Sequence, residues 1–286
     1  MNRLNPSHPA ARRSFAVLIL LLVAACARVP EPRLFPEAPN DITVRTDALL
    51  PADVVLLGEQ HDAAEHQHIH QHVVARLAVD GKLGALALEM ADAGRSTAAL
   101  KSNSTQLAVQ EALGWNSKSW PWAAYGPAVM VAVKAGVPVL GANLPAAQMR
   151  EAMADTRLDG QLPGSALKAQ QQLIRIGHCG FLPEDRISPM TRIQVARDIS
   201  MARTIQQAAL PGKTVVLLAG SGHVNRELGV PQHLPAGTIV KAVLLRAGPP
   251  PAKPDARPGA GKAPAFDVVW TTPAVPEKDY CEGLRK

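Results

Sequence analysis

Aromatic side chains are scarce in this sequence of 286 residues, which contains four Trp, four Phe and two Tyr. A hydrophobic core must therefore be built mainly from Ala, Val, Leu and Ile, and any cluster of rings is conspicuous. Apolar residues nevertheless make up 47% of the chain. This fraction is too high for a disordered chain, and the length suits one large domain or two small ones.

The sequence also lacks a hydrophobic run long enough to span a bilayer and a local excess of one charge. The apolar run from Phe15 to Ala25 has eleven residues, whereas a membrane-spanning helix needs about 20. The net charge of +6 comes from 30 Lys and Arg against 24 Asp and Glu, which are spread along the chain. This spread does not favour a nucleic acid as a partner.

The N-terminal segment is typical of a secretory signal. Arg12 and Arg13 precede the apolar run, and small residues follow it up to Cys26. The end of the run, Leu22 to Cys26, resembles the lipobox of bacterial lipoproteins, in which the cysteine is lipidated and becomes the first mature residue. Residues 1–25 are therefore predicted to be a lipoprotein signal peptide, with an ordinary signal peptide as the alternative.

Two further resemblances concern export and location. Arg12-Arg13-Ser14-Phe15 resembles a twin-arginine signal, which leaves the Sec and Tat export routes both open. Ala27, not an aspartate, follows the cysteine, and by resemblance this implies sorting to the outer membrane. We therefore expect a lipid-anchored protein on the periplasmic or cell-surface face of that membrane.

After the signal, the sequence divides into a tether and one domain. Residues 26–45 are rich in Pro and carry little apolar periodicity, as a spacer between a lipid and a domain does. Residues 46–286 form the predicted domain, in which residues 247–265, rich in Pro, Gly and Ala, are predicted to be a flexible insertion. Cys179 and Cys281 are a pair that an oxidising compartment allows to join, the alternative being two unrelated buried thiols.

Short apolar runs bounded by Gly or Pro alternate with longer segments of helical spacing. This alternation predicts an α/β fold with a mostly parallel central sheet flanked by helices. The expected strands are Val54–Leu57, Ala85–Leu88, Val137–Leu140, Val215–Ala219, Ile239–Leu245 and, at the sheet edge, Phe266–Thr271. The expected helices include Glu65–Val79, Pro127–Ala135, Ala166–Ile176 and Thr191–Ala209. Ligand sites in such folds lie at the carboxyl ends of the strands.

A histidine-rich segment follows the first expected strand. Five of the nine histidines fall within twelve residues: His61, His66, His68, His70 and His72. Of these, His61 lies at the strand exit together with Glu59. A helix that began at His61 would place Glu65, His68 and His72 on the same face as His61. This spacing would let the side chains bind one metal ion. The favoured alternative is that His68, His70 and His72 are solvated residues of a helix surface.

A second group follows the expected strand Val215–Ala219. The turn Gly220-Ser221-Gly222 leaves room for a ligand near the backbone, and His223 would project from the same sheet edge as His61. Glu89, at the end of another strand, would lie close by. The alternative is a tight turn or a phosphate loop, although the Lys-Ser or Lys-Thr pair of a P-loop is missing. The Gly-x-Ser-x-Gly context of a nucleophile elbow is also missing, which disfavours a serine hydrolase.

The third group is aromatic. Trp115, Trp120, Trp122 and Tyr125 fall within eleven residues of a sequence that has few rings. Such rings can form a flat apolar lining for a planar ligand, and tyrosine is one of the side chains that ligate haem iron. The alternative is a small hydrophobic cluster beneath a loop.

Several motifs between Val54 and Cys281 occur together in a fixed order. They are Leu57–Asp62 with His66, Ala87–Met90, Trp122-x-x-Tyr125-x-Pro127, Gly136-x-Pro138, Asn143-x-Pro145, Gly177–Gly180 and Gly220–His223. Together they resemble the ChaN family of haem-binding lipoproteins, which belongs to the wider Tiki and TraB group and has a fold like that of EreA. The resemblance implies a haem held in a pocket at the interface of a homodimer.

The resemblance to ChaN also implies roles for single residues. Tyr125 is implied as the ligand of the haem iron, with a nearby histidine to tune its phenol, for which His178 is the candidate. The other residues implied at the haem are His61, His66, His223, Met90 and Trp122. An outer-membrane haem receptor is the further partner that such a protein would need.

Two functions are therefore expected from the sequence. The first is a lipid-anchored haem-binding protein in haem or iron uptake, whether it transports, stores or senses haem. The alternative is a metal-dependent hydrolase, a peptidase or an esterase, because the wider group contains such enzymes. In that alternative Glu59, His61 and His223 hold a divalent ion, or act with Glu89 as acid and base on water. A purely structural lipoprotein would leave these polar strand ends unexplained.

Overall fold

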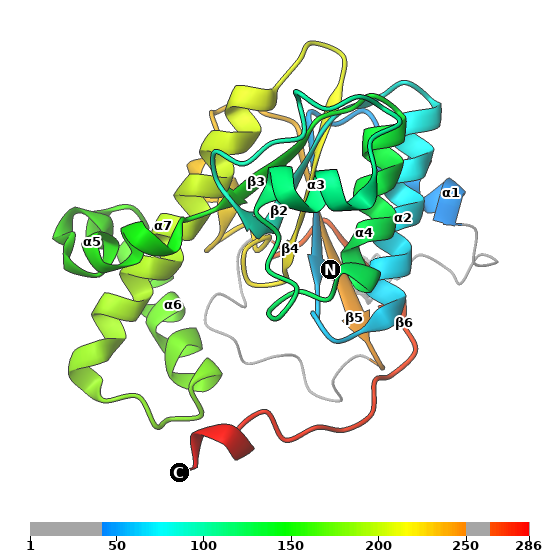
Figure 1. Cartoon of the computed structure of the whole chain (residues 1–286). Coiled ribbons are helices and arrows are strands. Elements are labelled where there is room, and N and C mark those ends of the chain that lie inside the picture. The colour runs from blue at the N-terminus through cyan, green and yellow to red at the C-terminus, as the bar shows by residue number, and fades with distance from the viewer. Residues whose placement is uncertain (1–41, 250–263, 286) are drawn as a thin grey trace, which may run out of the picture. The chain divides into compact units, whose positions relative to one another are not determined.

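The computed structural model describes residues 42–249 and 264–285 (Figure 1). The predicted signal peptide, residues 1–25, and Cys26 lie outside the described residues, as do most of the predicted tether and of the predicted insertion. The described chain opens with helix α1 (Ile42–Asp47), in which Thr46 is buried. The last four residues assigned to the tether therefore belong to this helix.

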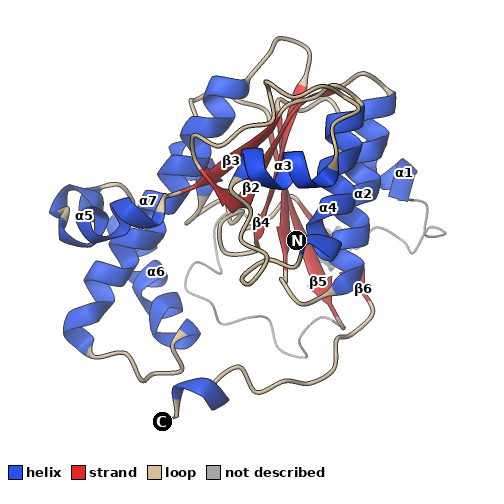
Figure 2. Ribbon diagram, in the orientation of Figure 1, coloured by secondary structure: helices blue, strands red, loops and turns tan. Residues whose placement is uncertain are grey.

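A sheet of six parallel strands forms the centre of the domain, which confirms the α/β fold expected from the sequence (Figure 2). The strand order is β3-β2-β4-β1-β5-β6. The strands are β1 (Val54–Glu59), β2 (Leu83–Asp92), β3 (Val139–Asn143), β4 (Thr214–Gly220), β5 (Val240–Ala247) and β6 (Val268–Thr272). β6 pairs with β5 at one edge, as expected for the last strand.

The two middle strands, β4 and β1, are buried along their whole length because helices cover both faces of the sheet. In β1, Val55 and Leu57 belong to the core on one face, and Val54 and Leu56 to the core on the other. This alternation follows from the pleat of a strand, in which successive side chains point to opposite faces. It also decides on which side of the sheet the polar residue at the end of each strand lies.

More of the described helices lie on one face of the sheet than on the other. Helix α2 (Ala64–Val79) packs on α4 (Trp122–Lys134) against one face, where α1 and α3 (Gln106–Leu113) also lie (Figure 1). The C-terminal half of α7 (Glu184–Ala208) covers the other face, with Met201, Ala202 and Ile205 in its core.

The N-terminal half of α7 continues beyond the sheet and carries two further helices. α5 (Met149–Ala154) and α6 (Gly164–Gly177) pack on it, away from the central strands (Figure 2). A small apolar group that includes Leu144, Ala152 and Ala196 fills this contact. The short 3-10 helices are Ala146–Gln148, Thr156–Gly160, Val230–His233 and Glu282–Leu284. The α6–α7 pair thus forms an arm beside the sheet.

Two helices begin earlier than the sequence pattern predicts. α4 begins at Trp122, five residues before Pro127, and α7 begins at Glu184, before Pro189. In each case a second proline, Pro121 or Pro183, stands immediately before the true start. A proline inside a helix loses one backbone hydrogen bond, so Pro127 was expected to begin a helix, and the expected start at Thr191 likewise lay beyond the internal Pro189.

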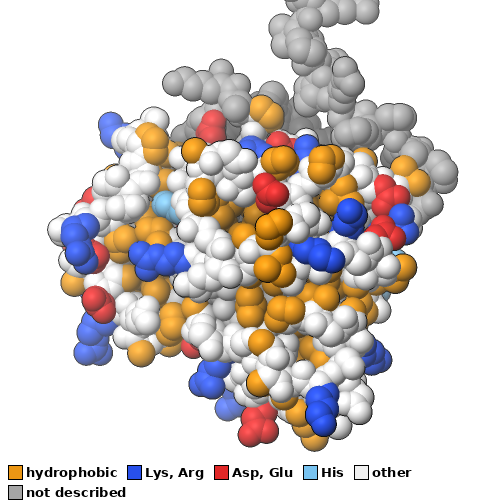
Figure 3. Space-filling model, turned by 90° about the horizontal axis from the view of Figure 1, so that it is seen from above, with side chains coloured by type: hydrophobic (Ala, Val, Ile, Leu, Met, Phe, Trp, Pro, Cys, Tyr) orange, Lys and Arg blue, Asp and Glu red, His pale blue; other side chains and the backbone are white. Residues whose placement is uncertain are grey.

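None of the described helices is long and apolar enough to cross a membrane. Figure 3 shows one face of the molecule, on which charged side chains of both signs stand apart from one another among apolar ones. On that face, neither sign gathers into a single patch.

Truncation in the central strand tests the importance of the sheet core. Leu217 in β4 is fully buried, so Leu217→Ala should lower the free energy of unfolding by about 2–5 kcal/mol through lost burial and a residual cavity. Leu107 in α3 is 78% exposed, and Leu107→Ala should change it by no more than about 0.5 kcal/mol. Urea unfolding measures both, and equal losses would contradict this description of the core.

Candidate functional site

A cleft of about 1050 Å³ opens at the carboxyl ends of β1, β2, β4 and β5. Its walls include the strand ends with Glu59, Glu89 and Gly220, the loop before α4, and the tip of the α6–α7 arm. Part of the C-terminal segment after β6 also lines it. Parallel sheets place ligand sites at this edge because residues from several loops meet there.

Glu59 ends β1 and collects hydrogen bonds from three elements. Its Oε1 accepts from the hydroxyl of Tyr125 at 2.6 Å and from Nδ1 of His61 at 2.7 Å. Its Oε2 accepts from Nε2 of Gln67 at 2.7 Å, and His70 lies 3.7 Å from that oxygen. Burial acts to raise the pKa of Glu59, but the hydrogen bonds from His61 and Tyr125 lower it overall. The side chain is therefore a carboxylate.

His61 is oriented by Glu59 so that its second nitrogen faces the cleft. With Nδ1 bound to Glu59, Nε2 lies 4.0 Å from Oε2 of Glu89, and the side chain is 41% exposed. The ring packs edge-on against Trp120, with centroids 4.9 Å apart. A Cβ at Gly220 would lie 2.9 Å from Nε2, so glycine there leaves room for the ring. Burial acts to lower the pKa of His61, but Glu59 and Glu89 raise it.

A second charged group lies on the opposite side of the sheet. His223 bonds Asp198 of α7 through Nδ1 at 2.5 Å, and its Nε2 lies 3.4 Å from Oε1 of Glu89. The amide of Gly220 also donates to Glu89, at 2.7 Å. Gln194 of α7 contacts the same imidazole ring at 3.0 Å.

The pKa values in this group follow from burial and from the three neighbouring charges. Burial acts to lower the pKa of His223, but Glu89 and Asp198 raise it to about 10. Burial acts to raise the pKa of Glu89, which His223 nevertheless lowers to about 2. For Asp198 burial prevails and raises the pKa to about 6. At neutral pH His223 is therefore an imidazolium ion held by carboxylates, with no lone pair for a metal.

The histidine-rich helix α2 forms neither the metal-binding face nor the fully solvated surface that the sequence analysis considered. α2 begins at Ala64, so His61 lies in the preceding turn and does not share a helix face with Glu65. His68 and His72 are exposed on α2, as the surface interpretation predicts. In the described ranges, no group of three or more His, Cys, Asp or Glu residues is arranged to hold a metal ion.

His66 and His70 are both buried on the inner face of α2. The prediction that His70 is a solvated surface residue was therefore wrong, because the helix turns it towards Glu59 and the core. His66 accepts from the amide of Gln60 through Nδ1 and donates from Nε2 to Thr272, so neither nitrogen is free. Burial lowers the pKa of His70 to about 4, which keeps this ring neutral.

Tyr125 lies beneath the cleft, with its side chain 2% exposed. Its ring contacts Trp115 and Trp120, with centroid distances of 6.1 and 5.9 Å. Its hydroxyl donates to a glutamate, Glu59, where the resemblance implied a histidine partner. Burial, followed by the charge of Glu59, raises the pKa of Tyr125. This environment favours the neutral phenol over the phenolate.

The remaining residues implied at the haem lie apart from the cleft. Met90 is 3% exposed in the core between the sheet and α4, where the pleat of β2 directs it. The indole of Trp122 donates to Gln106 at 2.7 Å and lines a separate hollow of about 290 Å³. His178 ends α6 and bonds the carbonyl of Ile174 at 2.8 Å. None of these three residues is among those that line the cleft.

Sequence reasoning missed Asp198, the partner of His223. Asp198 is followed by Met201, Ala202 and Ile205, which have the spacing of one buried helix face. A carboxylate in such a stripe must find a partner, and this signal was available in the sequence.

The comparisons with known proteins identify the family and agree with the fold. The family model of haem-binding uptake proteins, described as ChaN of the Tiki superfamily, matches residues 46–234. This chain belongs to the ChaN family. Its similarity to the solved structure of ChaN of Campylobacter jejuni, described as binding haem cofacially, has 25% identity and a TM-score of 0.60. That match covers 72% of this chain and 86% of the other.

Two further solved structures are more distant from this ChaN-family chain. The type III effector HopBA1 has 14% identity and a TM-score of 0.42, covering 82% of this chain and 94% of its own. A Bacillus cereus protein has 16% identity and a TM-score of 0.41, covering 76% and 70%. Likenesses this low carry no argument about function. Among curated proteins, none matches this chain.

The buried imidazolium makes stability depend on pH. The pKa of His223 is about 10 in the folded protein and near 6.5 when unfolded, so its contribution is complete below pH 6.5. As the pH rises from about 6.5 towards 10, this contribution should fall by up to about 1.4 kcal/mol per pH unit. Urea unfolding of wild type and His223→Gln across this range measures the difference, with His72→Gln as an exposed control. Parallel pH profiles for wild type and His223→Gln would contradict the assignment.

Proposed function

We propose that this ChaN-family protein binds haem in the cleft and that Nε2 of His61 is the ligand of the iron. The observation that carries the proposal is the orientation of this ring. Nδ1 donates to a buried carboxylate, and Nε2 lies 4.0 Å from Oε2 of Glu89, beyond hydrogen-bond distance, in a ring that lines the cleft. Histidines that ligate metals in proteins usually donate their other N–H in this way, which fixes the ring and makes it a stronger ligand. Histidine is among the usual axial ligands of haem.

The cleft suits a large planar anion in size and lining. Its volume of about 1050 Å³ lies at the upper end of the range of small-molecule sites, roughly 300–1000 Å³. Leu244, Leu245 and Pro121 give it apolar walls. Arg246 and Lys278 supply positive charge for the two carboxylates of haem. Bound haem supplies an iron ion with open axial positions, and the protein supplies the ligand and the walls.

Tyr125, the ligand implied by the resemblance, fits this role less well than His61. Before its oxygen could reach an iron atom, the phenol would have to leave Glu59 and emerge from beneath Trp120. The side chain would also have to lose a proton that its surroundings retain. We assign Tyr125 a positioning role, in which its hydroxyl holds Glu59 and, through Glu59, the ring of His61.

The cellular setting is proposed from the sequence and from the family. The lipobox-like segment ending at Cys26 supports a lipid anchor, and Ala27 supports the outer membrane. The ChaN relative described as binding haem cofacially supports a homodimer that forms on haem binding. The description of the family supports a role in haem or iron uptake. An outer-membrane haem receptor is the further partner that such a role would need.

A metal-dependent hydrolase is the second candidate, because Glu59, His61, Glu89 and His223 do converge at one edge of the sheet. Hydrolysis of a peptide and ester panel that disappears on chelation and in His223→Ala would favour this candidate. No chelator-sensitive activity would remove it.

Ferric haem titrated into residues 27–286 tests the proposed site. Wild type should give a saturable Soret shift, and His61→Ala should weaken binding at least about tenfold and change the ligation spectrum. His68→Ala removes an exposed histidine of the same segment and should bind like wild type.

Tyr125→Phe decides between the two ligands. If His61 is the ligand, Tyr125→Phe should keep the ligation spectrum and lose affinity only modestly, since the phenol acts through Glu59. A Tyr125→Phe protein that loses the spectrum, with His61→Ala unchanged, would overturn the assignment of His61.

A further inference from the structure

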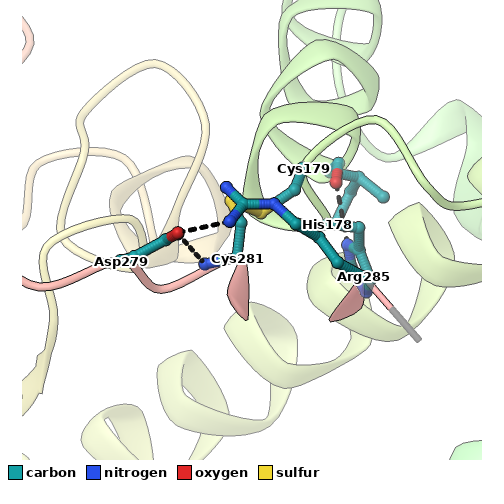
Figure 4. Close-up of a disulfide and its surroundings, with 6 residues drawn as sticks. His178, Cys179, Asp279, Cys281 and Arg285 are labelled. Carbon is teal, nitrogen blue, oxygen red and sulfur yellow. Dashed lines mark hydrogen bonds and ion pairs between the residues drawn. A yellow bond between two sulfur atoms is a disulfide. The ribbon is translucent and has the colours of Figure 1, made fainter. Parts of the chain in front are cut away.

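The C-terminal segment crosses from the edge strand to the α6–α7 arm. After β6 it runs past the lower end of the sheet and ends beneath α6 (Figures 1 and 2). There Cys281 forms a disulfide with Cys179, between α6 and α7, with 5.9 Å between their Cα atoms (Figure 4). Lys278 and Tyr280, just before this disulfide, line the cleft. The segment is thus connected at both ends, with its middle at the site.

Few other contacts hold this segment to the domain. From Ala274 to Arg285, its hydrogen bonds to other described residues all come from Tyr280, whose hydroxyl donates to Asp62 at 2.8 Å and accepts from Gln60 at 3.1 Å. Asp62 and Gln60 are the neighbours of His61 in the sequence. Most of the segment is exposed, so burial contributes little to its position. Apart from the backbone connection to β6, the disulfide is the covalent bond that holds the C-terminal segment to the domain.

The segment also brings a positive charge to the cleft. The ammonium of Lys278 lies 5.4 Å from the centre of the Tyr280 ring, and Arg246 of β5 lines the same cleft. Within residues 42–249 and 264–285, neither cation forms an ion pair with a carboxylate. The charge of Lys278 acts on Asp62, whose pKa it helps to lower, but no ion pair fixes the ammonium there. Cations outside close ion pairs that line a cleft are suited to an anionic ligand.

We propose that residues 273–285 form a wall of the ligand cleft, held in place by the Cys179–Cys281 disulfide, and that Lys278 is a specificity-determining residue for a ligand carboxylate. This inference rests on the proposed haem function, because it names the group that pairs with a propionate. Tyr280 positions the wall by joining it to the turn that carries His61. Without the disulfide, the contacts among described residues that still join the wall to the domain are its connection to β6 and the hydrogen bonds of the Tyr280 hydroxyl.

The wall is tested first without haem, by the rate at which diethylpyrocarbonate modifies His61. The double variant Cys179→Ser with Cys281→Ser removes the disulfide and leaves no lone thiol. Modification of His61, followed by mass spectrometry, should become several-fold faster in this variant, while exposed His68 keeps its rate as an internal control. Equal rates for His61 in the two proteins would overturn the wall. Circular dichroism checks that the double variant keeps its fold.

The charge is tested with two ligands that differ in one respect. Lys278→Gln should weaken ferric haem binding several-fold but leave binding of haem dimethyl ester unchanged, since the ester has no free propionate. Lys101→Gln, which removes an exposed lysine from another loop, should change neither. Equal affinity of wild type and Lys278→Gln for haem, or equal losses for both ligands, would overturn the role of Lys278.

The two proposals fail in distinguishable ways. If no form of the protein binds haem while the disulfide still protects His61, the haem function fails and the wall stands. If wild type binds haem and removal of the disulfide changes neither haem affinity nor His61 modification, the wall fails and the haem function stands.

Discussion

The site depends on one buried carboxylate, that of Glu59 at the end of β1. A carboxylate removed from water is unfavourable unless donors surround it, and three elements supply them. Tyr125 brings α4 to it, Gln67 brings α2, and His61 brings the turn between strand and helix. The same bonds that stabilise the charge therefore fix two helices against the sheet and aim one imidazole nitrogen at the cleft.

A second carboxylate, Glu89, repeats this arrangement on the opposite face. The pleat of β2 sends it towards α7, where the ring of His223 neutralises it and Asp198 in turn bonds the other nitrogen of that ring. His61 lies between the two systems, with one nitrogen bonded to Glu59 and the other facing Glu89. Both layers of helices thus contribute to a single edge. The strand ends supply the buried part of the site, and the arm and the C-terminal segment supply the rest of its walls.

Much of the fold could be predicted from the sequence, because the strands are apolar runs and all but β5 end in a polar or glycine residue. The residues at the ends of β1 and β4 were found in this way. The burial of His66 and His70 could also have been predicted, because both share a helix face with the apolar Val73 and Leu77. The sequence could not give the strand order, and without it nothing indicates that Tyr125 meets Glu59, 66 residues away. The path of the C-terminal segment to the cleft depends likewise on contacts distant in sequence.

The central claim, that Glu59 directs Nε2 of His61 to the iron, is tested most directly by hyperfine spectroscopy of the ferric haem complex. Protein labelled with nitrogen-15 in histidine alone separates a histidine ligand from the porphyrin nitrogens. The account predicts a histidine nitrogen coupled strongly to the iron, and this coupling should be absent from His61→Ala. A complex in which only porphyrin nitrogens couple to the iron would contradict it.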